Sequence, residues 1–202
     1  MRSSSDAADA ERPLVVVTVG TDHHPFDRLV RWVDTWASYA TPRVKCFVQT
    51  GTSTVTPRVA AWAPYVSRDE LRSLMSNAAA VVCHGGPATI MDCRRAGVKP
   101  VVVPRRRALG EHVDDHQLLF ARRAARANDV DLVESEEQLR AILDAALSEP
   151  GTRRIERSDH GDLAASIRRF QALADPLLGL KVAPQSESEK RVEPVASRRR
   201  GR

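Results

Sequence analysis

The chain has 202 residues, of which 42% are hydrophobic and 28% charged, so it is long and apolar enough to form one globular core. Its formal net charge of +5 is uneven, because residues 181–202 hold seven Lys and Arg against three Glu and leave about +1 elsewhere. This balance argues against a nucleic-acid-binding face. The sequence has no apolar run near bilayer-spanning length, and residues 1–12 lack the hydrophobic core of a signal peptide.

Strand-like and helix-like patterns alternate along the chain. The first half predicts a strand at 14–19, a helix at 26–40, a strand at 44–49, a turn-rich loop at 51–57, a strand at 63–66 and a helix at 68–77. The second half predicts strands at 78–82, 99–104 and 131–133, each followed by a helix, at 87–96, 114–127 and 136–147. Ser67 and Ser135 fit the N-cap positions of two helices. This alternation predicts an α/β fold with a Rossmann-like, doubly wound parallel sheet.

A glycine turn joins the predicted strand at 78–82 to the helix that follows it. Gly85 and Gly86 let the backbone approach a ligand closely, and Pro87 suits the first helical position. Unpaired N–H groups at the start of a helix favour a phosphate or diphosphate. A tight turn can also need glycine for its geometry alone. Gly97 is expected to end this helix.

A second polar loop follows the next predicted strand, at 99–104. It runs from Arg105 to Gln117 and contains three consecutive arginines, residues 105–107, which either attract an anionic ligand or form an exposed charged stretch. In an open α/β sheet, ligands bind outside the carboxyl ends of the strands. Both loops can therefore converge on one crevice.

Three stretches of sequence together resemble the C-terminal, donor-binding domain of family 28 glycosyltransferases, which include the MurG-type N-acetylglucosaminyltransferases. They are His84–Gly97, Val103-Pro104 with Asp115-His116-Gln117, and Val17–Thr21 with Pro25–Leu29. The resemblance covers residues 13–148, and its opening strand and helix look like those of stand-alone catalytic subunits of two-part enzymes, of the PssE type.

This resemblance implies a single half of a GT-B glycosyltransferase. The chain would bind a UDP-sugar and transfer its hexosyl group, with inversion and without a metal or other cofactor, to a lipid-linked saccharide acceptor in polysaccharide or glycolipid synthesis. The acceptor would be bound by a membrane-associated partner subunit. Cys46, Cys83 and Cys93 lack C-x-x-C spacing, which favours reduced thiols in the cytoplasm. We therefore expect a cytoplasmic chain, held peripherally at the inner face of the plasma membrane by its partner.

The resemblance also assigns roles in binding the donor. Backbone amides of the glycine turn would stabilise the leaving diphosphate, Asp92 would contact the ribose, and the polar residues after the second loop would bind the sugar. The predicted donor-binding residues are Gly20, Thr21, His84, Gly85, Gly86, Pro87, Ala88, Thr89, Asp92, Asp115, His116 and Gln117. An acidic residue at a helix N-terminus, such as Asp115, can also be favoured only because its charge interacts with the helix dipole.

His23 and His24 are the predicted catalytic residues, because an imidazole can accept a proton from the acceptor hydroxyl near neutral pH. Two alternatives stay open: these are exposed loop histidines, or the partner chain supplies the base. His112 and His116 are four residues apart, which invites a metal-binding interpretation, but no H-E-x-x-H motif and no obvious third ligand accompany them. We expect no metal site.

Two other classes of function need to be compared with this one. A dehydrogenase would need G-x-G-x-x-G after the first strand, and Val19-Gly20-Thr21-Asp22 lacks it. A non-catalytic nucleotide-sugar-binding or regulatory subunit remains an alternative. The expected organisation is a disordered N-terminus at 1–12, the donor-binding domain at 13–150, a helical extension at 151–180 with a helix near 162–174, and a disordered basic tail at 181–202.

Overall fold

The computed structural model describes residues 12–149 and 151–156, and its centre is a six-stranded sheet in which every pairing is parallel. Its strands are β1 (Leu14–Thr18), β2 (Lys45–Gln49), β3 (Ala61–Ala63), β4 (Ala78–Cys83), β5 (Val101–Val102) and β6 (Asp131–Leu132). They are ordered β3-β2-β1-β4-β5-β6. The predicted doubly wound α/β fold is confirmed.

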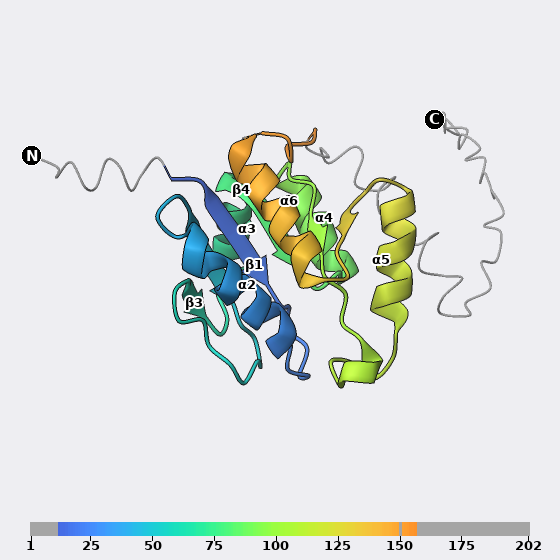
Figure 1. The fold of residues 1–202 in the computed structure, drawn as a ribbon. Helices are drawn as coiled ribbons and strands as arrows, with labels where there is room; N and C mark the ends of the chain where they lie inside the picture. Colours follow the sequence, from blue (N-terminus) through green and yellow to red (C-terminus); the bar gives the residue numbers. More distant parts are fainter. Residues whose placement is uncertain (1–11, 150, 157–202) are drawn as a thin grey trace, which may run out of the picture.

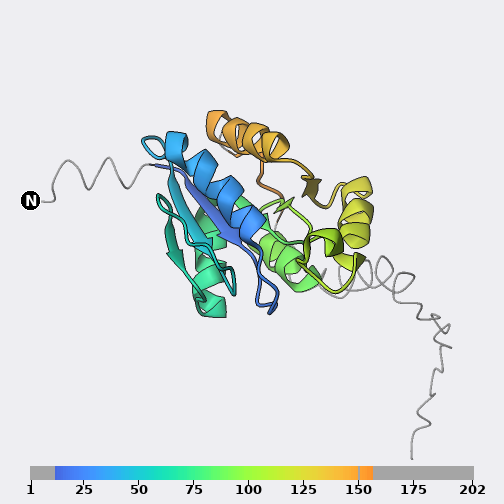
Figure 2. The same ribbon diagram turned by 60° about the horizontal axis from the view of Figure 1, so that its bottom comes forward.

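Helices cover both faces of the sheet (Figures 1 and 2). They are α2 (Asp27–Ala40), α3 (Arg68–Asn77), α4 (Pro87–Arg95), α5 (His116–Arg126) and α6 (Glu136–Ser148), with a 3-10 turn, η1, at Arg107–Leu109. The buried residues of α2 and α6 pack on one face, and those of α3, α4 and α5 pack on the other. The result is a three-layer sandwich.

Local sequence explains where several helices begin and end. The Ser67 hydroxyl accepts a hydrogen bond from the Glu70 amide at 3.1 Å, and Ser135 accepts one from the Gln138 amide at 3.3 Å. Both predicted N-caps are therefore confirmed, and each satisfies a backbone donor that the first helical turn cannot pair. Gly97 has a φ of +73° one residue after the C-cap of α4, Ala96, which confirms the predicted helix end.

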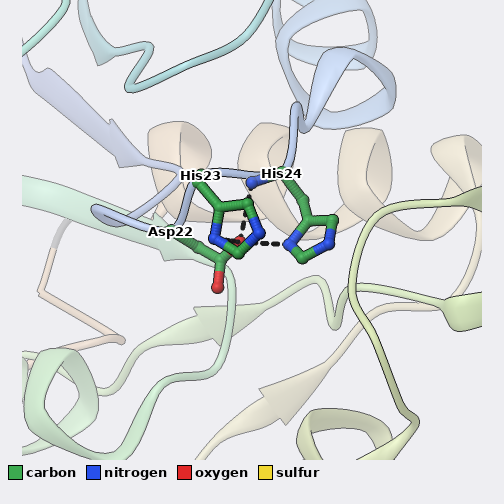
Figure 3. A group of neighbouring side chains, drawn as sticks. All are labelled: Asp22, His23 and His24. Carbon is green, nitrogen blue, oxygen red and sulfur yellow. Dashed lines mark hydrogen bonds and ion pairs between the residues drawn. The ribbon is translucent and has the colours of Figure 1, made fainter.

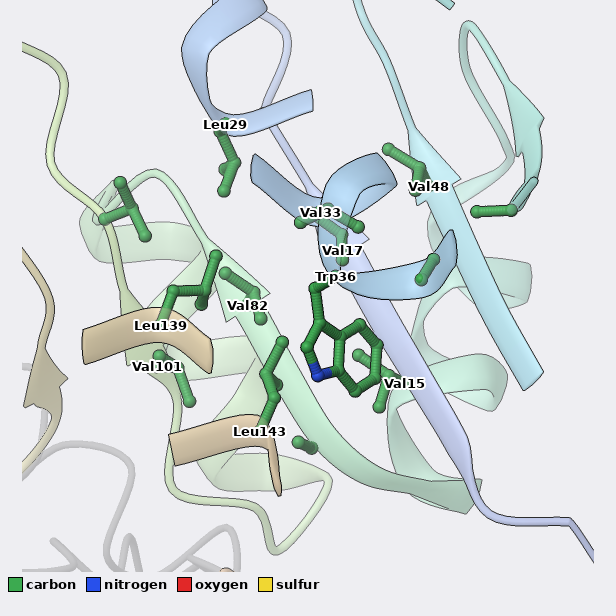
Figure 4. Packing of buried hydrophobic residues seen from close by; sticks show 14 of the residues in the cluster. Val15, Val17, Leu29, Val33, Trp36, Val48, Val82, Val101, Leu139 and Leu143 are labelled. Atoms are coloured by element: carbon green, nitrogen blue, oxygen red, sulfur yellow. The ribbon is translucent and has the colours of Figure 1, made fainter. Parts of the chain in front are cut away.

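The α2–α6 side contains the largest buried cluster (Figure 4). Val15 and Val17 from β1 and Leu143 from α6 are fully buried in it. Trp36 of α2 is only 2% exposed, and its indole N–H donates to the Asp144 carboxylate of α6 at 2.9 Å. A buried indole N–H needs such a partner, so this bond fixes α2 against α6.

Two strands differ from their predicted ranges by two residues or more at each end, and both are bordered by proline. β3 lies at Ala61–Ala63 rather than 63–66 and ends before Pro64, which has no N–H to continue the ladder. β5 is limited to Val101–Val102 between Pro100 and Pro104. The expectations for residues 1–11 and 157–202, including the helix near 162–174 and the basic tail, lie outside the described residues. Within the described part, no helix is long and apolar enough to cross a membrane.

The chain changes direction across the sheet between β1 and β4. From β1 the chain moves through β2 to β3 at one edge, and from β4 it moves through β5 to β6 at the other. In open α/β sheets such a reversal of strand order is the place where ligands bind, outside the carboxyl ends of the two central strands, here β1 and β4. The predicted site residues after both strands lie at this switch point.

Candidate functional site

The turns after β1 and β4 meet at the switch point around the ring of His84. A Cβ on Gly20 would stand 2.5 Å from Cε1 of His84, and a Cβ on Gly86 would come equally close to Nε2. Gly20 and Gly85 also have φ angles of +82° and +91°, which side chains rarely adopt. The glycines are therefore needed both for backbone conformation and to make room for the imidazole.

His84 is only 8% exposed, and its Nδ1 makes no hydrogen bond within the described part of the chain. Burial lowers the pKa of His84 to about 4, because it disfavours the cation, and the charge of Arg105 adds to this effect. The ring is therefore neutral at pH 7. It brings an unused polar atom to the point where the two turns meet.

The N-terminus of α4 opens onto the same turn. Gly86 is the N-cap and offers no side chain to it, and Pro87 is the first helical residue. The next two amides, of Ala88 and Thr89, have no carbonyl one turn back within the helix. Ala88 is exposed and Thr89 is half-buried, so this end of α4 can present both N–H groups to an anion.

α5 packs its first turns beside the glycine turn. A Cβ on Gly85 would lie 3.9 Å from the Cβ of Ala121, which is one helical turn after Gln117 on the same face. Oε1 of Gln117 is buried and has no hydrogen-bond partner among the described residues. Asp115 and His116 are exposed at the start of the helix. The predicted residues after the second loop therefore begin α5 at this edge, and Gln117 shares the helix face packed against the turn.

Asp92 lies in the second turn of α4 and faces α3. Its Oδ1 is 3.0 Å from Arg72, 3.1 Å from Arg95 and 3.4 Å from Arg68. Burial alone would raise the pKa of Asp92, but the hydrogen bonds and charges of Arg72 and Arg68 lower it overall. The carboxylate is ionised and 13% exposed. Its contact with a ribose stays a prediction.

His23 and His24 come together with a carboxylate that the sequence reasoning missed (Figure 3). Oδ1 of Asp22 accepts from the His24 amide at 2.8 Å and lies 2.7 Å from Nδ1 of its ring. Burial alone would raise the pKa of Asp22, but its bonds to His24 and the charges of Arg105 and His112 lower it overall. An ionised carboxylate at Nδ1 holds the proton there and leaves Nε2 as a proton acceptor. His23 is 83% exposed.

Residues 14–169 match the family described as the glycosyltransferase family 28 C-terminal domain. The chain belongs to this family. The resemblance inferred from its motifs is thereby confirmed, and a glycosyltransferase relationship is established for most of its length.

The sequence of this family 28 domain is similar to that of a curated transferase. It is 28% identical over 172 residues to the UDP-N-acetylglucosamine–N-acetylmuramyl-(pentapeptide) pyrophosphoryl-undecaprenol N-acetylglucosamine transferase of Acidithiobacillus ferrooxidans. That match covers 81% of this chain and only 40% of the relative. The chain therefore spans well under half of the curated relatives it matches.

Two solved structures share the fold. The crystal structure of Acinetobacter baumannii MurG has a TM-score of 0.51 at 19% identity, covering 87% of this chain and 52% of the other. The solution structure of ALG13 has a TM-score of 0.52 at 15% identity, covering 83% of this chain and 98% of the other. The fold is thus one half of a GT-B architecture, and it also occurs as nearly the whole of a solved chain.

Arg105 holds together two loops at the carboxyl edge of the sheet of this family 28 domain. It is fully buried, and its guanidinium donates to the carbonyls of Val19 at 2.8 Å, His24 at 2.7 Å and Glu111 at 2.9 Å. Both expectations for Arg105 were therefore wrong, because it neither attracts an anion at the surface nor belongs to an exposed charged stretch. It fixes the loop after β1 against the loop after β5.

His112 follows Glu111 in that second loop and comes near Asp22. Its Nε2 lies 3.6 Å from Oδ2 of Asp22, and its ring centroid is 5.8 Å from that of His24. The sequence paired His112 with His116 by helical spacing, but α5 begins only at His116, so His112 lies in the loop. No local pattern links Asp22 to a residue 90 positions away, which is why the sequence reasoning missed this neighbourhood.

Proposed function

We propose that this family 28 domain binds a UDP-sugar at the switch point and transfers its hexosyl group to a lipid-linked saccharide acceptor. One observation carries the proposal: the N-terminus of α4, which no side chain caps, lies beside two glycine turns that enclose the unpaired Nδ1 of His84, and α5 brings the unpaired Oε1 of Gln117 to the same edge of the sheet. Such unpaired buried atoms favour a polar ligand that pairs with them. Family membership supports a nucleotide sugar as that ligand.

The amides of Ala88 and Thr89 would bind the diphosphate of the donor. Negative charge grows on the diphosphate as the glycosidic bond breaks, and fixed N–H dipoles stabilise that charge without reorganising. The positive end of the α4 dipole acts in the same direction. These groups supply the stabilisation that a metal would otherwise give, so the proposed transfer is metal-independent. Asp92 is proposed to bind the ribose, and Asp115, His116 and Gln117 the sugar.

His24 is the proposed general base, with Asp22 as its positioning residue. The carboxylate holds a proton on Nδ1, so Nε2 can take the proton of the acceptor hydroxyl as that oxygen attacks the anomeric carbon. Attack from the face opposite the leaving diphosphate inverts the anomeric centre. His23, which is exposed beside it, is the second candidate.

The acceptor and the rest of the active site are proposed to come from a membrane-associated partner chain. The curated relatives are named for transfer to a pyrophosphoryl-undecaprenol acceptor, and this chain corresponds to 40% of their length. In the solved structure of ALG13, a fold of this kind makes up nearly the whole chain. Within this proposal residues 13–150 are the donor-binding domain, 151–180 a docking extension and 181–202 a basic tail. The partner would keep the chain at the cytoplasmic face of the plasma membrane, where it would serve polysaccharide or glycolipid synthesis.

Calorimetric titration of the full chain with UDP-GlcNAc, UDP-glucose, UDP-galactose and UDP-glucuronate tests donor binding. Gly85→Ala places a Cβ 2.8 Å from Val102, whereas Gly110→Ala, also at positive φ, meets nothing within 4 Å. We expect one UDP-sugar to bind with 1:1 stoichiometry, Gly85→Ala to abolish binding, and Gly110→Ala to keep it. Failure of every UDP-sugar to bind, or equal binding by both variants, would contradict the proposal.

Transfer is tested with membranes of the source organism, labelled UDP-sugar and the purified full chain. The proposal requires label to enter the lipid extract only when the chain is added. Donor binding without any such transfer would instead identify a non-catalytic nucleotide-sugar-binding subunit.

A further inference from the structure

We propose that Asp22, His23, His24 and His112 form a binding site for a divalent transition-metal ion of the zinc class. The ligand atoms of the first three lie within 4.8 Å of one another, and His112 joins them from the loop after β5. The sequence showed only His112 and His116 at helical spacing. The fold instead brings His112 to a carboxylate and two imidazoles from the loop after β1.

The distances between ligand atoms suit one ion. A tetrahedral zinc ion with bonds of ~2.0–2.1 Å places neighbouring ligand atoms roughly 3.3 Å apart. From the Asp22 carboxylate the ring nitrogens lie at 2.7 Å for His24, 3.6 Å for His112 and 3.8 Å for His23. The ligand atoms of Asp22, His23 and His24 lie within 4.8 Å of one another and the ring centroids of His24 and His112 are 5.8 Å apart, so rotation of the histidine side chains would be needed to bring all four groups onto one ion.

The two loops that carry these ligands are held together before any ion binds. One guanidinium nitrogen of Arg105 donates to the carbonyls of His24 and Glu111, the residue before His112. Glu111 is anchored in turn by two hydrogen bonds of 2.8 Å from Arg28. This support limits the entropy that metal binding must overcome, as a second shell of contacts does in metal sites.

The donor set selects the class of ion. Three imidazoles and one carboxylate suit zinc and its neighbours, whereas magnesium and calcium prefer oxygen ligands throughout. At 18–24% side-chain exposure, Asp22, His24 and His112 are open enough for an ion to enter, and His23 is largely exposed.

Metal binding and the base role of His24 exclude each other, a consequence that rests on the proposed function. In the metal-free arrangement Nδ1 of His24 faces Asp22 and carries the proton. Coordination through Nδ1 would move that proton to Nε2, which then has no lone pair to accept a proton from the acceptor. Zinc would therefore inhibit transfer while leaving the diphosphate site on α4 untouched.

Titration of the full chain with cobalt(II) chloride tests the site without donor, acceptor or partner. We expect one Co²⁺ per chain, with the intense visible absorption of tetrahedral nitrogen and oxygen ligation, and its displacement by zinc chloride. Asp22→Asn and His112→Gln should each weaken cobalt binding by at least ~tenfold. Asp69→Asn, in the exposed first turn of α3, is the control expected to bind cobalt like the wild type.

Cobalt that binds with unchanged affinity to Asp22→Asn and His112→Gln, or that shows only the weak spectrum of the aqueous ion, would overturn the site. Circular dichroism of each variant establishes that it is folded. If cobalt binds as expected but the chain transfers no sugar, the metal site stands and only its inhibitory role falls.

Discussion

Gly20 lies so close to the imidazole of His84 that any Cβ at residue 20 would stand 2.5 Å from Cε1 of that ring. The contact joins the turn after β1 to the turn after β4, which the sequence separates by more than 60 residues. Gly86 approaches the same ring, and a Cβ there would stand 2.4 Å from its Nε2. The buried imidazole of His84 therefore lies between the two turns and is in close contact with both. Replacing or displacing it should change the free energy of unfolding and the donor affinity together.

Gly20→Ala should displace His84 and strain the turn, because residue 20 also has a φ of +82°. We expect the free energy of unfolding to fall by about 1–3 kcal/mol, with loss of donor affinity. Gly110→Ala, at a φ of +69° in open space, reports the strain of positive φ alone. Urea unfolding and calorimetry measure both effects. Equal losses in the two variants would mean that the contact with His84 contributes nothing.

The free energy of unfolding should depend on pH because His84 is protonated more readily in the unfolded chain than in the folded one. Its pKa is lowered from 6.5 to about 4 in the fold, so between these values the unfolded chain binds a proton that the folded chain does not. This contribution is fully present above pH 6.5 and is lost as the pH falls toward 4, at a total cost of up to roughly 3 kcal/mol. Urea unfolding of the wild type and of His84→Gln from pH 7 to pH 4.5 measures it. The unfolding free energy of His84→Gln should depend less steeply on pH than that of the wild type. Parallel curves for the two proteins would contradict a lowered pKa of His84.

Asp22→Asn should impair transfer but spare donor binding. The amide can donate to Nδ1 of His24, which favours the tautomer whose Nε2 is already protonated. We expect kcat to fall by at least ~10²-fold, in line with the loss of a general base, while the calorimetric donor affinity changes little. Asp69→Asn, in the first turn of α3, is the matched control. A kcat equal to that of the wild type would remove His24 as the base.

Asp92→Asn should expose the repulsion among the three arginines around it. Removing the charge leaves the guanidinium groups of Arg68, Arg72 and Arg95 without their shared partner. Because these arginines are partly exposed, we expect a loss of only about 1–2 kcal/mol in unfolding free energy, smaller at high salt. Urea unfolding at two salt concentrations is the measurement. A loss that grows with salt would contradict this electrostatic explanation.

The sequence predicted those features of the fold that local residue patterns determine. Periodicity located the helices, the apolar run of residues 78–82 located the central strand, and Ser67 and Ser135 marked helix starts that the structure confirms. The glycine turn was also recognisable, because the backbone conformation of such a turn requires glycine. β3 begins two residues earlier than predicted and ends before Pro64, and β5 occupies only the middle of its predicted range, between Pro100 and Pro104.

Side chains paired across the fold could not be predicted in the same way. Arg105 begins a run of three arginines that a local pattern treats as solvated, yet its carbonyl partners make full burial possible. The approach of Asp22 to His112 depends on how the loop after β1 packs against the loop after β5. The arginines that surround Asp92 come largely from α3, whose packing against α4 no local pattern specifies.

Backbone amide NMR spectra of the labelled full chain during titration with UDP test the proposed donor position most directly. The diphosphate should shift the amide resonances of Gly85, Gly86, Ala88 and Thr89 most strongly, with a smaller change at the start of α5. Saturable shifts confined to other parts of the sheet, or no shifts at any concentration of UDP, would contradict donor binding at the switch point between β1 and β4.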